Sequence, residues 1–139
     1  MEKIYIVDTT VLLDNPEYIR TLNNDEVVIP IEVMNEINSK NSHTDKIGHN
    51  ARMASRLINY LLDHNEKPSI KLMSFKELKI NSSFNYLLLS QEELILGLAK
   101  EIDLKEKIVG SGKKVIVLTK DSLLRVKGDA IGVICSDIH

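Results

Sequence analysis

KIYIVD, residues 3 to 8, is a run of β-branched and aromatic side chains that ends on an acid, Asp8. KVIVLTKD, residues 114 to 121, has the same format and ends on Asp121. Apolar runs without polar alternation are typical of strands buried on both faces, as in a parallel sheet covered by helices. We therefore expect two central strands of a parallel sheet, each followed closely by an acid.

Shorter apolar runs between and after these two segments predict further strands. They are Val27–Ile29, Ile70–Met73 and Ile131–Ile134. Pro30 follows the first of them directly and is expected at the first position of a helix, where its missing N–H has no partner to lose.

Helical patterns fill the rest of the chain. Apolar residues recur at steps of three and four from Ile47 to Leu62, which predicts an amphipathic helix. Ser90 to Glu93 has the pattern of a capping box that opens another helix, and Pro16–Leu22 is expected to be a short one. Loops are expected at 39–45 and 108–114. Strands alternating with helices predict an α/β three-layer domain, a central parallel sheet flanked by helices, over residues 1–139.

Composition excludes several classes of protein. The 18 Lys and Arg residues against 20 Asp and Glu residues give a net charge of -2, which excludes a broadly basic nucleic-acid binder. A single cysteine, Cys135, excludes a disulfide framework and a multi-cysteine zinc site. No apolar run approaches the about 18 residues of a membrane span, so we expect a cytoplasmic protein without a membrane partner.

The acids at the two strand ends are the first candidates for a site. In open parallel sheets, ligands bind outside the carboxyl ends of the strands, so Asp8 and Asp121 would meet there if their strands are neighbours. Two charges about 4 Å apart repel by about 4 kcal/mol at an effective dielectric near 20, so they need a cation or must share protons. Carboxylate oxygens favour Mg²⁺ or Mn²⁺. The alternative is that Asp8 begins a turn and Asp121 caps a helix.

Spacing leaves the role of the other acids open. Glu32 and Glu36 are four residues apart on one helix face, so either could reach the crevice, or both could be solvated charges. Glu93 stands where a capping box requires it, which leaves Glu92 the freer carboxylate.

Four stretches, in this order and spacing, resemble PIN-domain nucleases, most closely the PIN module that precedes the ATPase of PhoH-like proteins. They are IVDTTVLLDNP (6–16), VVIPIEVMNEI (27–37), IGHNARMASRL (47–57) and VIVLTKDSLLRVKGDAIGV (115–133). The resemblance implies a parallel sheet flanked by helices and a cluster of carboxylates that binds one or two Mg²⁺ or Mn²⁺ ions.

The resemblance also implies site residues. The catalytic and metal-binding acids would be Asp8, Glu36, Glu92 and Asp121, with Asp129 as an auxiliary acid and with Thr9 and Thr119 supporting the metal ligands. Two positions depart from the family pattern. Thr10 stands in place of the usual Asn, and Glu92 in place of the usual Asp.

The activity implied is hydrolysis of phosphodiester bonds in single-stranded RNA by a metal-dependent endoribonuclease. The candidate RNA-binding cations are Arg52, Arg56, Lys120, Arg125 and Lys127; for the first two the alternative is a solvated helix face. Tyr60 and Tyr86 could stack on bases or be half-buried packing residues.

Two other functions compete with this one. The two departures would also suit a catalytically degenerate PIN module that binds RNA or a protein partner. A receiver-like phosphate-handling domain would need an acid at the end of a middle strand, where the sequence has Pro30 and Ser74. A homodimer is expected from the resemblance alone.

Overall fold

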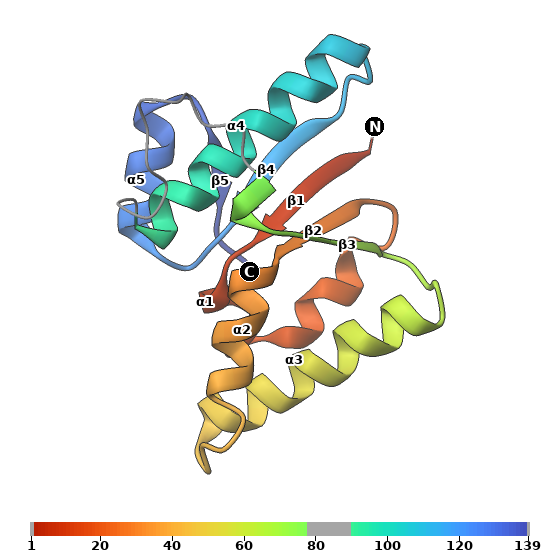
Figure 1. Cartoon of the computed structure of the whole chain (residues 1–139), viewed down its shortest axis with the longest axis vertical. Helices are drawn as coiled ribbons and strands as arrows, with labels where there is room; N and C mark the ends of the chain where they lie inside the picture. The colour runs from red at the N-terminus through yellow and green to blue at the C-terminus, as the bar shows by residue number, and fades with distance from the viewer. Residues whose placement is uncertain (1, 78–89, 139) are drawn as a thin grey trace.

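The computed structural model describes residues 2–77 and 90–138, and it contains one parallel sheet (Figure 1). The strands follow the order β3-β2-β1-β4-β5 across the sheet. Their bounds are β1 Lys3–Val7, β2 Glu26–Pro30, β3 Ser69–Met73, β4 Lys114–Leu118 and β5 Ile134–Ser136. The two expected central strands are neighbours, with Val7 opposite Leu118, so the residues that follow them emerge side by side at one edge of the sheet.

Helices cover both faces of this sheet. Figure 1 shows α4 and α5 on one side and α2 and α3 on the other. The helical elements are α1 Thr9–Asp14, η1 Pro16–Leu22, α2 Ile31–Ser39, α3 Lys46–Asp63, η2 Phe75–Glu77, α4 Gln91–Val109 and α5 Ser122–Ala130. This arrangement confirms the predicted three-layer α/β fold.

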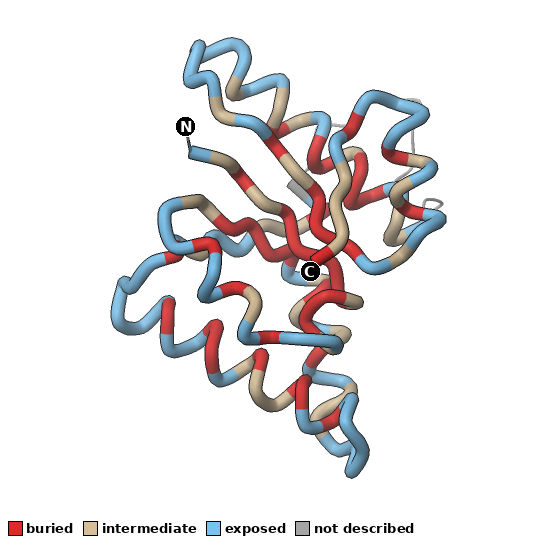
Figure 2. The backbone as a smooth tube through the Cα atoms, turned by 180° about the vertical axis from the view of Figure 1, so that it is seen from behind, coloured by how far each residue is buried: buried red, intermediate tan, exposed pale blue. Residues whose placement is uncertain are grey.

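The core lies where the strands meet the apolar stripes of the helices. Figure 2 shows buried backbone running through the middle of the molecule. Ile6, Ile29 and Val117 on adjacent strands are fully buried, and α3 presents Ala54 and Ile58 to the same core. The apolar residues that predicted strands and helices are therefore the ones that hold the layers together.

Several boundaries differ from the sequence-based expectation. The helix after β2 begins at Ile31, because Pro30 is still in extended backbone (φ -60°, ψ 137°) as its N-cap. The segment 16–22 is a 3-10 helix. The last strand starts only at Ile134, because α5 ends in a turn in which Gly132 has φ 80°. The expected loop 108–114 is partly helical, since α4 extends to Val109.

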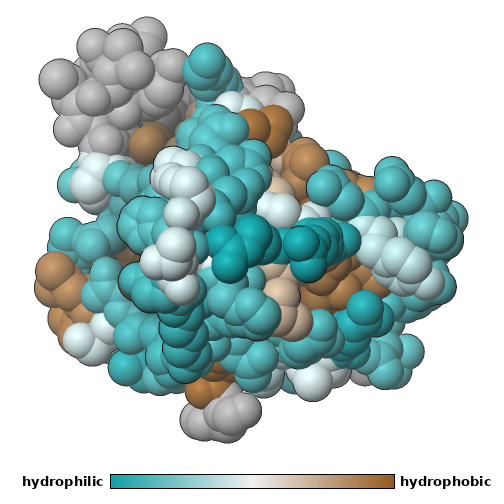
Figure 3. Space-filling view, turned by 90° about the horizontal axis from the view of Figure 1, so that it is seen from below, coloured by the Kyte–Doolittle hydropathy of each residue, from teal (hydrophilic) through white to brown (hydrophobic). Residues whose placement is uncertain are grey.

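Hydrophilic side chains cover most of the surface seen from below, with separate hydrophobic areas between them (Figure 3). Within the described residues, none of the helices combines the length and apolar character that crossing a membrane requires.

Candidate functional site

Asp8 stands at the junction of β1 and α1. Its backbone N–H donates to the Leu118 carbonyl at 3.0 Å, continuing the pairing of the two strands. Its Oδ1 accepts the Thr9 N–H at 2.8 Å and so caps α1. Only 7% of the surface of Asp8 is exposed. Asp8 is therefore a buried acid, held by one hydrogen bond to β4 and one to the start of α1.

Two threonine hydroxyls hold the other oxygen of Asp8. Oδ2 accepts from Thr10 Oγ1 at 2.9 Å and from Thr119 Oγ1 at 2.8 Å. The same two hydroxyl oxygens accept the backbone N–H groups of Lys120 and Asp121, both at 3.0 Å. The end of β1 and the loop after β4 are thereby joined through one carboxylate.

Asp121 caps the next helix. Its Oδ1 accepts the N–H groups of Leu123 at 2.9 Å and Leu124 at 3.4 Å, at the start of α5. The capping alternative is therefore correct for Asp121, and Asp8, which was expected to begin a turn, caps a helix as well. Capping does not remove either acid from the site, because Asp8 and Asp121 also line one cavity.

The choice between the two α2 glutamates is resolved by their contacts. Glu36 Oε1 accepts from Thr9 Oγ1 at 3.1 Å and from Gln91 Nε2 at 3.0 Å. Glu32 instead accepts from the Ser74 hydroxyl at 2.8 Å and the Phe75 N–H at 3.1 Å. Glu36 lines the cavity, whereas Glu32 fastens α2 to the chain that follows β3.

Glu92 comes from the opposite side, in the first turn of α4. Ser90 caps α4 as predicted, because its Oγ accepts the Glu93 N–H at 3.1 Å. Glu93 also reaches back to Ser90, where its Oε1 accepts from the Ser90 hydroxyl at 3.2 Å. Glu92 is thereby left to the cavity, where its Oε2 lies 3.1 Å from Lys127 Nζ of α5.

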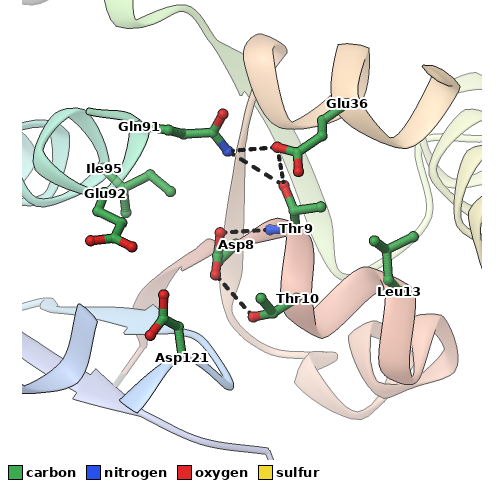
Figure 4. Close-up of a pocket in the computed structure, with 9 residues that line it drawn as sticks. All are labelled: Asp8, Thr9, Thr10, Leu13, Glu36, Gln91, Glu92, Ile95 and Asp121. Atoms are coloured by element: carbon green, nitrogen blue, oxygen red, sulfur yellow. Dashed lines mark hydrogen bonds between the residues drawn. The ribbon is translucent and has the colours of Figure 1, made fainter. Parts of the chain in front are cut away.

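These side chains surround a cavity of about 360 Å³. Figure 4 shows the carboxylates of Asp8, Glu92 and Asp121 facing a common space, with Glu36 on the far side of Thr9. The lining residues are Asp8, Thr9, Thr10, Leu13, Glu36, Gln91, Glu92, Ile95 and Asp121. All four acids that the sequence singled out are therefore brought to one place.

The donor chemistry of the cavity suits a hard divalent cation. Carboxylate and hydroxyl oxygens line it, and no histidine or cysteine of the described residues does, which favours Mg²⁺ or Mn²⁺ over softer metals. In the described part of the chain, no three His, Cys, Asp or Glu side chains form a group close enough to hold an ion as they stand. The four acids therefore fit a Mg²⁺ or Mn²⁺ ion in two respects: their oxygen donors are of the kind that these ions prefer, and they line the same cavity.

Thr10 and Gln91 are the site residues whose contacts the sequence did not predict. Thr10 supplies the donor to Asp8 that the departure from the usual Asn put in question. Gln91 donates to Glu36 from the first residue of α4. The sequence pattern did place Gln91 at the start of a helix. Its partner Glu36 is 55 residues away in the sequence, so their contact is visible only in the folded chain.

The candidate RNA-binding cations lie outside the cavity lining. Lys120 Nζ is 3.4 Å from Asp137 Oδ1 and 3.8 Å from Asp14 Oδ2, and Lys127 pairs with Glu92. Arg125 is half-buried on α5. Binding of RNA by these three residues stays a prediction.

The two α3 arginines differ from each other. Arg52 Nη1 donates to the backbone carbonyls of Asn41 at 2.6 Å and His43 at 2.9 Å, so it holds the 39–45 loop against the helix. Arg56 is exposed. Asp129 is exposed near the end of α5 and does not line the cavity.

Two other side chains named so far, Tyr60 and Cys135, have a raised pKa away from the cavity. The exposed Tyr60 ring stacks on His64 with centroids 4.1 Å apart, and its hydrogen bond to Glu66 raises the pKa of the Tyr60 hydroxyl. Burial raises the pKa of the half-buried Cys135 thiol. Tyr86 lies outside the described residues.

Comparison with known proteins decides the family. The family model described as "PIN domain" matches residues 5–139. The chain belongs to the PIN domain family. PIN domains are typically nucleases and generally use divalent metals.

This PIN domain has curated relatives named Protein PhoH2. It is 36% identical over 146 residues to that of Bacillus subtilis (strain 168), covering 99% of this chain and 33% of the relative. It is 27% identical over 142 residues to that of Mycolicibacterium smegmatis, covering 99% of this chain and 32% of the relative. The PIN domain thus spans about a third of the length of the curated relatives it matches.

Solved structures share the fold of this PIN domain. A domain of a functionally unknown protein from Methanocaldococcus jannaschii matches with a TM-score of 0.64 and 21% identity, covering 99% of this chain and 91% of that one. The PIN domain of human SMG5 matches with a TM-score of 0.56 and 15% identity, covering 96% and 91%. At these identities the likeness concerns the fold alone.

Proposed function

We propose that this PIN domain is a divalent-metal-dependent endoribonuclease that hydrolyses phosphodiester bonds of single-stranded RNA. The observation that carries the proposal is the convergence of four acids on one cavity at the carboxyl edge of the sheet. Asp8 follows β1, Glu36 comes from α2, Glu92 from α4 and Asp121 from the N-cap of α5. Acids that merely cap helices or face solvent have no reason to meet from four elements.

Asp8, Glu92 and Asp121 would hold Mg²⁺ or Mn²⁺, because their carboxylates face a common space (Figure 4). A bound divalent ion supplies charge neutralisation at the scissile phosphate and lowers the pKa of a coordinated water. The two threonine hydroxyls on Asp8 Oδ2 keep that carboxylate oriented before the substrate arrives.

Glu36 is suited to accepting a proton. Its Oε1 is occupied by Thr9 and Gln91, and among the described residues nothing donates to Oε2. An oriented carboxylate with one open oxygen can position an attacking water and take its proton. Substrate phosphates would be met by the cations of the α5 side, Lys120, Arg125 and Lys127.

Cleavage of a labelled single-stranded RNA with Mn²⁺ tests the proposal. We expect cleavage that EDTA stops, and a loss of about a hundredfold or more in Asp8→Asn and in Asp121→Asn. Asp103→Asn is the matched control, because Asp103 pairs with Lys107 at 2.9 Å on the body of α4 away from the cavity. Cleavage that survives EDTA, or full activity in both site variants, would contradict the proposal.

A second candidate is a PIN module that binds RNA or a protein partner without cutting. It is favoured by the ion pair that occupies Glu92 and by the absence of a ready three-acid group in the described residues. Calorimetric titration with Mn²⁺ separates the two. Failure to bind at about millimolar Mn²⁺, a level at which even weak carboxylate sites fill, supports the non-cutting module.

A further inference from the structure

Glu92 differs from the other three cavity acids in how its charge is offset. Its Oε2 lies 3.1 Å from Lys127 Nζ, and the two side chains are 32% and 42% exposed. Within the described residues, Asp8, Glu36 and Asp121 have no cationic side chain in ion-pair distance. Among the described residues, Glu92 is therefore the one cavity acid that forms an ion pair with a lysine or arginine side chain.

Neutral donors hold the other three acids. Asp8 accepts from one backbone N–H and two hydroxyls, Glu36 from a hydroxyl and an amide, and Asp121 from two backbone N–H groups. A neutral donor orients a carboxylate and leaves its formal charge in place, available to a metal ion. An ammonium cancels that charge.

We propose that Lys127 is a built-in counter-cation that competes with the divalent ion for Glu92 and thereby weakens metal binding by the cavity. The inference rests on the proposed function, since it requires that the cavity bind such an ion. A divalent ion and an ammonium repel each other, so binding of the ion at Glu92 requires Lys127 to withdraw. The flexible four-carbon stem of lysine allows that movement.

The two helices favour a pair that can open. Glu92 lies in the first turn of α4 and Lys127 in the last turn of α5, where the helix dipoles favour a negative and a positive charge respectively. Each side chain therefore remains stabilised after the pair separates. The partial exposure of both also lets water solvate the freed ammonium.

The test is Mn²⁺ calorimetry on the full chain and four variants: Lys127→Met, Glu92→Gln, the double variant and Lys127→Arg. We expect Lys127→Met to bind Mn²⁺ about two- to fivefold more tightly, the range that a partly exposed ion pair sustains. The gain should vanish in the Glu92→Gln background and shrink as salt screens the charges. Lys127→Arg should resemble the parent.

Lys107→Met is the matched control, because it removes an ammonium paired with Asp103 outside the cavity; its Mn²⁺ affinity should not change. Equal or weaker Mn²⁺ binding by Lys127→Met would overturn the competition, and so would a gain of the same size in the Glu92→Gln background. Binding by Lys127→Met where the parent shows none supports it. If neither the parent nor any variant binds Mn²⁺, both the competition by Lys127 and the metal dependence of the proposed function are contradicted.

Discussion

At the scale of single residues, Asp8 is fixed by partners from the start of α1 and from the end of β4. The Thr10 and Thr119 hydroxyls donate to the same oxygen, and each of them also accepts a backbone N–H from the loop after β4. The position of Asp121 relative to Asp8 thus depends on these two hydroxyl groups. Of these, Thr10 is the most informative to change.

Thr10→Val keeps the shape of the side chain and removes its hydroxyl. Asp8 then loses one of two donors and the Lys120 N–H loses its acceptor, so we expect a loss of about 1–2 kcal/mol in the free energy of unfolding. Thr10→Ser should stay within about 0.5 kcal/mol of the parent. Urea unfolding measures both, with the exposed Thr44→Val as control; a Thr10→Val protein as stable as the parent would show that this junction contributes nothing.

The sequence predicted the acids better than their partners. Asp8 and Asp121 follow from their places after two apolar runs, and Glu92 from the capping box beside it. Gln91 contacts Glu36, and Lys127 contacts Glu92, across separations of 55 and 35 residues. Such contacts depend on how α4 docks, which no local pattern encodes.

At the scale of elements, the first turn of α4 controls one side of the cavity. Ser90 caps the helix, and the next two residues, Gln91 and Glu92, both line the cavity. Fraying of this helix start would displace an acid and the amide that holds Glu36.

Ser90→Ala should lower the free energy of unfolding by about 1 kcal/mol through loss of the cap. It should also weaken Mn²⁺ binding, because the first turn that presents Glu92 becomes less ordered. Asp45→Ala is the matched control: Asp45 caps α3 by accepting the Gly48 N–H at 3.1 Å, so it should lose similar stability and keep its Mn²⁺ affinity. Equal Mn²⁺ affinities in both variants would contradict the role of the α4 cap.

Element type was predicted best where the apolar pattern is strong. The two central strands and α3 were predicted correctly. No element was expected between Asp8 and Pro16, where the structure has α1, a short helix capped by Asp8. The strand expected at 131–134 starts later because Gly132 requires a turn first. Turn geometry and caps decided these boundaries.

At the scale of the whole molecule, one core supports both helix layers and the cavity. Ile6 on the central strand is fully buried. Ile6→Ala should lower the free energy of unfolding by about 2–5 kcal/mol. Ile108→Ala, at a position 75% exposed, should change it by no more than about 0.5 kcal/mol. Chemical denaturation measures both; similar losses would contradict a core centred on β1.

The near-neutral net charge of -2 is an average over separate charge environments. The acids of the cavity gather at the carboxyl edge of the sheet, while lysines and arginines lie beside it or pair elsewhere. From the sequence, the net charge was enough to exclude a broadly basic RNA binder. The local excess of carboxylates at the cavity can be seen only once the strands are placed side by side.

Anomalous diffraction from crystals soaked in Mn²⁺ tests the central claim, that the converging acids form a metal-dependent catalytic site. We predict a manganese peak in the cavity in contact with Asp8 and Asp121, and its loss in Asp8→Asn crystals. A cavity without manganese at a concentration that supports RNA cleavage, or a peak bound only elsewhere on the chain, would contradict the account.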